Sequence, residues 1–523
     1  MDIFELLLGL LAACVALAVF AQRLNLPVAV TLVVGGIGLA FIPGLPTVQL
    51  DPELVLALFL PPLLQVSAYR TDWPAFKNHL GPILLLAIGA VFFTAGVIAV
   101  TTKMLVPTIP WWAAIALGAI VAPPDAVAAT SILSQFKLPK RIVTVLEGES
   151  LINDASSLVL YKFAVAAVGA GAVSYGLGAL QFLGVAAGGA VIGWVAGRLA
   201  MWIFARLRDT VLDIAVSILA GFAAYLAAET IHVSGVIAAV MCGLVLGRQQ
   251  HAEFTARTRL ELVAIWSFVE FVLTSLVFVL IGLQLRGIIA RLEGYDFVHL
   301  STVCVSVSAA LIISRFVWVF PSAWLSRAVS RRMQEHDPTP PISHLTIISW
   351  TGMRGVVSLA AALALPENFP ERDIILFLTF SAIVATLIVQ GTTLGWLVRR
   401  LDVTEEAASL PEPETAQARA EIAAAALEAV KQHQDVASPH VEAAGELLQE
   451  YEVRAERASI EGQDVETKSG QLEAQQRLRL IAIGAGRTKL AEQTDAIDVE
   501  THRALGEELD LEEQQIRRAL GED

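Results

Sequence analysis

The sequence predicts an all-α membrane protein with about thirteen transmembrane helices and a helical cytoplasmic tail. Of its 523 residues, 55% are hydrophobic and only 16% are charged. Apolar runs of roughly 18 to 28 residues follow one another from Ile3 to about Arg399, and each can cross a hydrocarbon core of about 30 Å. The acidic residues gather beyond these runs, which indicates a soluble extension.

The polar loops between the apolar runs set the boundaries of the spans. We expect spans at roughly 3–21, 26–45, 52–69, 80–104, 110–131, 142–171, 177–205, 210–229, 231–247, 261–285, 296–320, 343–366 and 373–398. Sixteen Lys and Arg residues fall in one set of alternate loops and four in the other. Because basic loops stay in the cytoplasm, we expect the N-terminus outside the cell membrane and the tail inside.

Residues 1–400 are expected to form the membrane domain, and residues 401–523 an acidic helical tail. The tail holds 12 Lys and Arg against 28 Asp and Glu, whereas the first 400 residues hold 24 against 22. Helical patterns occur in the tail at 416–433, 440–458, 471–486 and 505–520. We interpret the tail as a solvated appendage; a regulatory domain that senses pH or a ligand, through the three histidines of the tail, is the alternative.

Four ionisable side chains are predicted to lie deep in the membrane. Asp154 is roughly 18 Å into the sixth span, and Asp125 is roughly 21 Å into the fifth span from the opposite face. Arg354 and Glu270 lie at comparable depth in the twelfth and tenth spans. An ionisable group at this depth costs about 2.5–3.5 kcal/mol on insertion scales, so it usually has a function.

The sixth span presents its polar residues on two neighbouring stripes. Ser150, Asp154 and Ser157 follow i, i+4, i+7 spacing and share one face of a helix. This stripe offers a carboxylate and hydroxyls, which are the oxygen ligands that a hard cation prefers. Glu149 and Asn153 lie on the neighbouring stripe, which offers a second carboxylate for pairing with a cationic side chain.

Two spans contain residues that interrupt a helix. Pro123 and Pro124 remove two backbone donors in the fifth span, and Gly352 and Gly355 flank Arg354 in the twelfth. Interrupted helices at membrane depth are tolerated where the free backbone lines a cavity, as in the ion sites of transporters with inverted repeats. Simple proline kinks are the alternative.

Two further charged residues and Ser157 have more than one interpretation. Arg315 either extends toward the membrane surface or joins the Glu149 network. Glu270 is either half of a structural pair or a functional group. An isolated serine inside a membrane helix, such as Ser157, usually bonds its own backbone.

Around these residues the sequence resembles monovalent cation/proton antiporters of the NhaP and NHE kind. "GESLINDASSLVLYKFA" is similar to the family's GES-L-x-ND signature, and "WTGMRGVVSLAAALAL" to its W-x-G-x-R-G-x-V-S-L-A element. The resemblance implies that Asn153 and Asp154 belong to the ion site. It also implies that Arg354 pairs with Glu149.

The sequence departs from the family pattern at two places. Pro124 stands where the family's T-D-P element has threonine, and a backbone carbonyl or Ser150 is a possible substitute. Family members often carry a carboxylate after P-P-L-L in the third span, where this chain has Gln65, Val66 and Ser67. Both departures bear on the choice and affinity of the cation.

The resemblance further implies a homodimer that works by elevator-like alternating access. Its dimerisation part would be residues 1–70 and 177–285, and its core part residues 80–171 and 296–400. The expected partners are membrane lipids, Na⁺, K⁺ or Li⁺, and H⁺, with no nucleic acid and no cofactor. The protein is expected to be a transporter for pH and sodium homeostasis and not an enzyme.

The exchange itself is assigned to Asp154, whose carboxylate would take a proton and a cation in turn. Ser150 and the Asp125 region would supply further ligands or scaffold, and Asn153 would tie the broken fifth span to the sixth. One titrating aspartate beside an asparagine favours electroneutral one-for-one exchange by family comparison. The three cysteines show neither disulfide nor metal-ligand spacing.

Three other functions remain open at this stage. K⁺ in place of Na⁺ is not distinguished by the ligand types. A cation-coupled symporter is not excluded, because a substrate pocket cannot be recognised from sequence. An intramembrane aspartyl protease would also use two membrane aspartates, but it needs them to share a proton and leaves Arg354 without a role.

Overall fold

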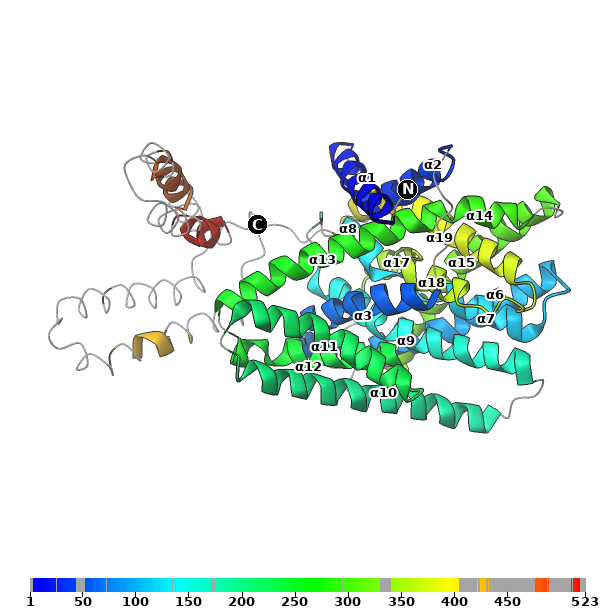
Figure 1. Cartoon of the computed structure of the whole chain (residues 1–523), viewed down its shortest axis with the longest axis horizontal. Coiled ribbons are helices and arrows are strands. Elements are labelled where there is room, and N and C mark those ends of the chain that lie inside the picture. The colour runs from blue at the N-terminus through cyan, green and yellow to red at the C-terminus, as the bar shows by residue number, and fades with distance from the viewer. Residues whose placement is uncertain are drawn as a thin grey trace. The chain divides into compact units, whose positions relative to one another are not determined.

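A computed structural model of the chain consists of helices without strands over the residues it describes (Figure 1). In the membrane-embedded part those residues are 3–24, 26–43, 52–71, 73–133, 135–136, 138–170, 175–207, 209–254, 256–292, 296–329 and 340–403. In the tail they are 421, 424–428, 431, 449, 476–486, 488, 509 and 511–517. The chain divides into two compact units, residues 1–405 and 406–523.

The first unit contains all the helices that Figure 1 labels, together with the short helices α4, α5 and η1, which it does not label. Their bounds are α1 Ile3–Arg23, α2 Val28–Ala40, α3 Pro52–Arg70, α4 Trp73–Asn78, α5 Leu80–Leu84, the π-helix η1 Leu85–Ala90, α6 Val91–Leu105, α7 Trp111–Val121, α8 Ala126–Leu133, α9 Lys140–Ala170, α10 Tyr175–Phe204, α11 Thr210–Thr230, α12 Gly235–Glu253, α13 Ala256–Leu283, α14 Leu285–Ala290, α15 Phe297–Val329, α17 Ile342–Trp350, α18 Val356–Leu363 and α19 Arg372–Leu401.

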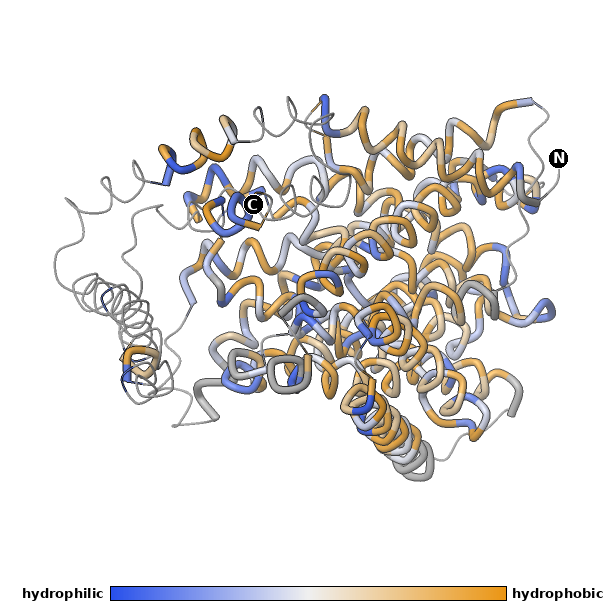
Figure 2. Tube along the Cα trace, turned by 60° about the vertical axis from the view of Figure 1, so that its left-hand side comes forward, coloured by the Kyte–Doolittle hydropathy of each residue, from blue (hydrophilic) through white to orange (hydrophobic). Residues whose placement is uncertain are grey.

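Every predicted span coincides with helical structure, and the chain is a multi-pass membrane protein. Over the described residues, eight helical segments are long and apolar enough to cross a membrane, and α2, α7 and the first part of α12 are shorter apolar helices. Figure 2 shows apolar residues along most of the helical trace of this unit. Trp194, Phe268 and Val305 are each more than half exposed, as expected for side chains that face lipid. The count of thirteen spans stays a prediction.

The fifth and twelfth spans are broken where the sequence predicts. Pro123 and Pro124 lie in the gap between α7 and α8, and Gly352 and Gly355 lie in the gap between α17 and α18. The half-helices α8 and α18 have eight residues each. The backbone N–H and C=O groups in both gaps lack the hydrogen bonds of a continuous helix and therefore need other partners.

The fourth span has an irregularity that the sequence does not reveal. It runs through α5, the π-helix η1 and α6, and the wider turn of η1 frees backbone carbonyls. Trp318 Nε1 of α15 donates to the Leu85 carbonyl at 3.0 Å. Ser156 Oγ of α9 donates to the Ala87 carbonyl at 2.7 Å, so η1 is held between two long helices.

Buried apolar clusters join the helices around the two breaks. One cluster connects α3 with α10, α11, α12 and α13 and includes the fully buried Trp266. A larger cluster connects α6, α7, α9, α15, α18 and α19. The predicted division into a dimerisation part and a core part stays a prediction.

Glycines bring two helix pairs into close contact. A Cβ at Gly36 of α2 would overlap the Val279 carbonyl of α13, and the Cα of Gly282 lies 3.1 Å from the same point. A Cβ at Gly193 of α10 would overlap the Ala238 carbonyl of α12. Small residues at such contacts let membrane helices pack backbone to backbone.

The second unit is helical at 424–428, 476–486 and 511–517, within three of the four segments predicted for the tail. Residues 421, 431 and 509 of these segments are also described as helical. The remainder of the three segments, and all of 440–458 except residue 449, lie outside the described residues. Ile483 and Ile516 are buried, as in packed amphipathic helices.

We predict that Gly36→Ala destabilises the protein and that Gly38→Ala does not. The added methyl at Gly36 meets the α13 backbone, whereas a Cβ at Gly38 meets nothing within 4 Å. Overpacking of this kind costs about 1–3 kcal/mol of unfolding free energy. The unfolding temperature of the detergent-solubilised variants tests this, and equal temperatures would contradict the α2–α13 contact.

Candidate functional site

The two helix breaks are joined to each other and to α19. The backbone N–H of Asp125, just before α8, donates to the Met353 carbonyl at 2.7 Å. The backbone N–H of Arg354 donates to Thr386 Oγ1 of α19 at 3.1 Å. Free backbone groups of one broken span are thus satisfied by the other and by a neighbouring helix.

The Asp125 carboxylate lies between the first turns of α8 and α18. Its Oδ1 accepts a hydrogen bond from the Val127 N–H at 2.9 Å, which caps α8. A Cβ at Gly355 would overlap the other carboxylate oxygen, so only glycine lets the α18 backbone approach so closely. Helix N-termini attract negative charge, and here two of them face one carboxylate.

Asn153 and Asp154 of α9 point to different surroundings. Asn153 Nδ2 donates to the Pro124 carbonyl at 3.3 Å, which is the contact between α9 and the broken span expected for this residue. Its Oδ1 is buried without a hydrogen-bond partner among the described residues. Asp154 is 7% exposed and lines a cavity beside the breaks.

That cavity, hereafter the aspartate cavity, has a volume of about 50 Å³. A few water molecules or one partly hydrated ion fit in this volume, whereas an organic solute does not. Its walls come from α3, the α7–α8 break, α9, α13 and α18. Its polar side chains are Ser67, Asp125, Ser150, Asp154, Thr274 and Ser358, and the remaining lining residues are leucine, valine, proline and glycine.

Ser67, Thr274 and Ser358 are cavity residues that the sequence did not predict. Ser67 lies four and seven residues after the cavity residues Leu63 and Leu60, so helical spacing was the available signal. Ser358 lies one turn after the break at Gly355. Thr274 is in a continuous apolar run, which gives no signal of helix orientation.

Gln65, which stands near the position of the family carboxylate, is buried away from this cavity. Its Nε2 donates to the Ser217 carbonyl of α11 at 2.6 Å. Gly221 of α11 leaves the space that the Gln65 amide fills. The third span therefore contributes the hydroxyl of Ser67 to the cavity and no charge.

Ser157 has a structural contact rather than a place in the cavity. Its Oγ donates to the Ala119 carbonyl of α7 at 2.6 Å, and the side chain is buried. Of the predicted stripe on α9, Ser150 and Asp154 line the cavity, while Ser157 fastens α9 to the first half of the broken span.

The structure gives Glu149 a different partner from the one predicted. Arg315 of α15 binds its carboxylate through both terminal nitrogens, at 2.6 and 2.8 Å, and both side chains are buried. Arg315 Nε also donates to the Ile348 carbonyl in the last turn of α17, at 3.0 Å. A bidentate pair with a third bond fixes α15 and α17 against α9.

Arg354, the predicted partner, is bonded within its own break. Its Nη1 donates to the Gly352 carbonyl at 2.6 Å, and its Nε is buried without a hydrogen-bond partner among the described residues. Among the described residues, Glu149 is therefore hydrogen-bonded to Arg315, while its interaction with Arg354 is electrostatic without a hydrogen bond. The predicted Glu149–Arg354 ion pair stays a prediction. Two arginines were candidates in the sequence, and the choice between them depends on tertiary packing.

Glu270 forms a structural pair. Its carboxylate lies 2.7 Å from Arg70 Nη1 at the end of α3, and Arg70 Nη2 donates to Ser267 Oγ at 3.0 Å. Both charged side chains are partly exposed. This pair joins α3 and α13, which are two of the walls of the aspartate cavity.

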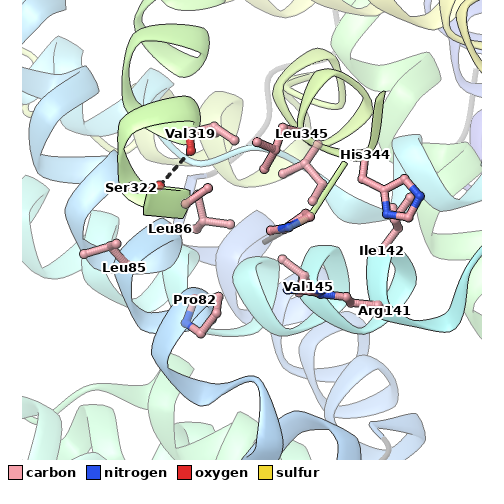
Figure 3. Close-up of a pocket in the computed structure, with 13 residues that line it drawn as sticks. Pro82, Leu85, Leu86, Arg141, Ile142, Val145, Val319, Ser322, His344 and Leu345 are labelled. Atoms are coloured by element: carbon pink, nitrogen blue, oxygen red, sulfur yellow. Dashed lines mark hydrogen bonds between the residues drawn. The ribbon is translucent and has the colours of Figure 1, made fainter. Parts of the chain in front are cut away.

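A second cavity, of about 40 Å³, lies between α5, η1, α9, α15 and α17 (Figure 3). Its described lining residues are mostly apolar, and none of them is a carboxylate. Arg141 and His344 lie on one side of it, and Ser322 donates to the Val319 carbonyl at 2.9 Å on the other. The described residues of this cavity therefore offer a cation no negative charge.

Comparison with known proteins gives a consistent match. Residues 9–400 match the family model described as "Sodium/hydrogen exchanger, transmembrane". A Mycobacterium tuberculosis protein named as an uncharacterised Na⁺/H⁺ exchanger is 33% identical over 99% of this chain and 95% of its own length. A sodium, potassium, lithium and rubidium/H⁺ antiporter of Bacillus pumilus is 35% identical over 77% of this chain and 62% of its own length.

A solved structure shares the fold. The sodium proton antiporter MjNhaP1 of Methanocaldococcus jannaschii superimposes with a TM-score of 0.59, covering 77% of this chain and 99% of that one. The sequence identity is 18%, so this likeness concerns the fold alone.

The Glu149–Arg315 ion pair leads to a test of stability. Arg315→Gln should lower the free energy of unfolding by about 3–5 kcal/mol, because it leaves the Glu149 carboxylate buried without its partner. Arg354→Gln should cost less, because it removes a buried charge whose Nε is already unpaired. Unfolding of both variants in detergent measures the difference, and the reverse order would restore Arg354 as the partner.

Proposed function

Because the chain belongs to the transmembrane sodium/hydrogen exchanger family, we propose that it exchanges a monovalent cation for protons at Asp154. The observation that carries this proposal is the buried Asp154 carboxylate, which lines a cavity of ionic size beside two crossing broken helices. The cation is Na⁺ or Li⁺, and K⁺ is the alternative. The Bacillus pumilus relative is named for all three of these ions and for rubidium, which supports keeping the alternative.

The chemistry follows from the cost of a bare charge in the membrane. A carboxylate removed from water needs a counter-charge, which either a proton or a cation supplies. Both use the same oxygens of Asp154, so binding of one excludes the other. Ser150 lies one helical turn before Asp154 and lines the same cavity, where its hydroxyl is available as a further ligand.

Asp125 has a scaffold role in this mechanism. Its carboxylate faces the first turns of α8 and α18, and its amide binds the Met353 carbonyl. This engagement also argues against an intramembrane aspartyl protease, in which both aspartates must be free to act on one water molecule. The size of the cavity argues against a symporter of organic solutes.

Charge counting supports electroneutral exchange. Around the breaks lie three carboxylates, from Asp125, Glu149 and Asp154, and two guanidinium groups, from Arg315 and Arg354. With every group ionised, this leaves one negative charge. A single Na⁺ or a single proton neutralises it, so one cation exchanged for one proton keeps the membrane interior neutral in both loaded states.

The remaining elements of the proposal concern its setting. The transporter is a homodimer in the plasma membrane, with its N-terminus outside and its tail in the cytoplasm. Alternating access arises when the core part moves as an elevator against the dimerisation part. The exchange requires no cofactor, because the transported ions themselves neutralise the buried carboxylate. It serves pH and sodium homeostasis.

We predict that Asp154→Asn abolishes cation-dependent proton flux in proteoliposomes that contain the purified protein. The asparagine amide neither exchanges a proton nor supplies the negative charge. The assay applies a pH gradient and adds NaCl, LiCl, KCl or choline chloride while the gradient is recorded.

Asp209→Asn is the matched control, because Asp209 caps α11 outside the cavity and asparagine is also an N-cap residue. It should transport as the unaltered chain does. Full exchange by Asp154→Asn would disprove the assignment of the exchanging carboxylate, and a response to KCl alone would change the substrate.

A further inference from the structure

Three hydroxyl-bearing residues that line the aspartate cavity, Ser67, Thr274 and Ser358, are unused by the mechanism described so far, and two of them are unpaired among the described residues. Ser358 of α18 and Thr274 of α13 both line the cavity. The side-chain oxygen of each is buried, and neither has a hydrogen-bond partner among the described residues. Ser358 as a whole is 1% exposed. Buried polar atoms are almost always satisfied, so an unpaired hydroxyl in a cavity indicates a bound water or ion.

Neighbouring hydroxyls show that pairing is the usual state in this membrane unit. Ser156, Ser157 and Thr386 each donate to a backbone carbonyl, at 2.7, 2.6 and 2.7 Å. Thr102 of α6 and Thr379 of α19 are also buried without a partner among the described residues, but neither lines the aspartate cavity. Ser358 and Thr274 differ from them because they lie on a cavity that has a carboxylate in its wall.

The other polar side chains that line the cavity are the hydroxyls of Ser67 and Ser150 and the carboxylates of Asp125 and Asp154. Asp154 offers a carboxylate, whereas the Asp125 carboxylate is engaged by the starts of two helices. A hard monovalent cation that loses part of its water needs several oxygen ligands, and neutral hydroxyls supply them without adding charge. Ser358 and Thr274 stand on different walls, one on a broken helix and the other on a continuous one.

We propose that Thr274 and Ser358 complete the oxygen shell of the transported cation beside Asp154 and determine its affinity. The inference rests on the proposed function, because it assigns ligands at the same site. Thr274 binds the cation from the α13 wall and Ser358 from the α18 wall. The energy of a hydroxyl dipole beside a cation falls with distance, so the smaller Li⁺ and Na⁺ depend on these hydroxyls more than K⁺ does.

The test compares Thr274→Val and Ser358→Ala with the unaltered full-length chain in proteoliposomes. Each variant should raise the Na⁺ and Li⁺ concentrations for half-maximal proton flux about five- to tenfold, as expected for one lost polar ligand, and should change the K⁺ value less. Thr274→Ser keeps the hydroxyl and should stay near the unaltered value. Thr379→Val is the matched control, because it removes an equally buried, unpaired hydroxyl outside the cavity.

A second measurement separates this inference from the proposed function. A cation that binds the folded protein raises its unfolding temperature in a concentration-dependent way, without any transport. In detergent, Na⁺ and Li⁺ should stabilise the unaltered chain and Thr379→Val at the same concentrations. Higher concentrations should be needed to stabilise Thr274→Val and Ser358→Ala. This measurement also decides the matter for a variant that does not reconstitute.

The outcomes are distinct. The assignment of Thr274 and Ser358 would be overturned if the half-maximal cation concentrations and the stabilisation were the same in Thr274→Val, Ser358→Ala, Thr379→Val and the unaltered chain. Cation-dependent proton flux in these proteins would still leave the antiporter function standing. Cation-dependent stabilisation that weakens in the two cavity variants, without flux in the unaltered chain, would support the ligands and overturn the function. An effect of Thr379→Val as large as that of Thr274→Val would also overturn the assignment.

Discussion

The hydrogen bond from the Asp125 amide to the Met353 carbonyl is the contact on which the proposed ion site depends. A broken helix inside a membrane exposes backbone groups that lipid cannot satisfy. Each break here supplies a partner for the other, and Asn153 of α9 binds the Pro124 carbonyl as well. Gly355 has no side chain, so the Asp125 carboxylate can lie against the start of α18. The crossing, the neighbouring α9 and the cavity beside Asp154 are therefore parts of one hydrogen-bonded unit.

The charged side chains around this crossing include one closed ion pair and, on another face of α9, one carboxylate that lines the cavity. Glu149 and Arg315 form a closed pair that uses both carboxylate oxygens, and Arg315 also holds the end of α17. Burying such a pair has a large desolvation cost, so its value lies in fixing one arrangement of α9, α15 and α17. Asp154 stands on another stripe of α9 and lines the cavity without an ion-pair partner among the described residues. Glu149 is thus committed to structure, whereas Asp154 is the carboxylate that the proposed exchange uses.

The sequence predicts the local features of this site and fails on the tertiary ones. Prolines and glycines locate both breaks because they act on their own backbone, and Asp154 is recognisable because a carboxylate in an apolar run is costly. The hydrogen-bonded partner of Glu149 could not be chosen from the sequence, because two arginines at similar depth compete, and only the packing of α15 against α9 brings Arg315 to it. Thr274 was missed because a continuous apolar helix carries no periodic signal of the face that turns toward the cavity.

The composition of the third span fits the charge balance of the site. A carboxylate among the residues after P-P-L-L, if it faced the aspartate cavity, would bring the count around the breaks to two negative charges. One monovalent cation would then leave a net charge in the membrane. In this chain, Gln65 turns to the Ser217 carbonyl of α11, and Ser67 presents a neutral hydroxyl to the cavity. The third span thereby leaves the count among the described residues at one negative charge, which is the balance that the proposed one-for-one exchange requires.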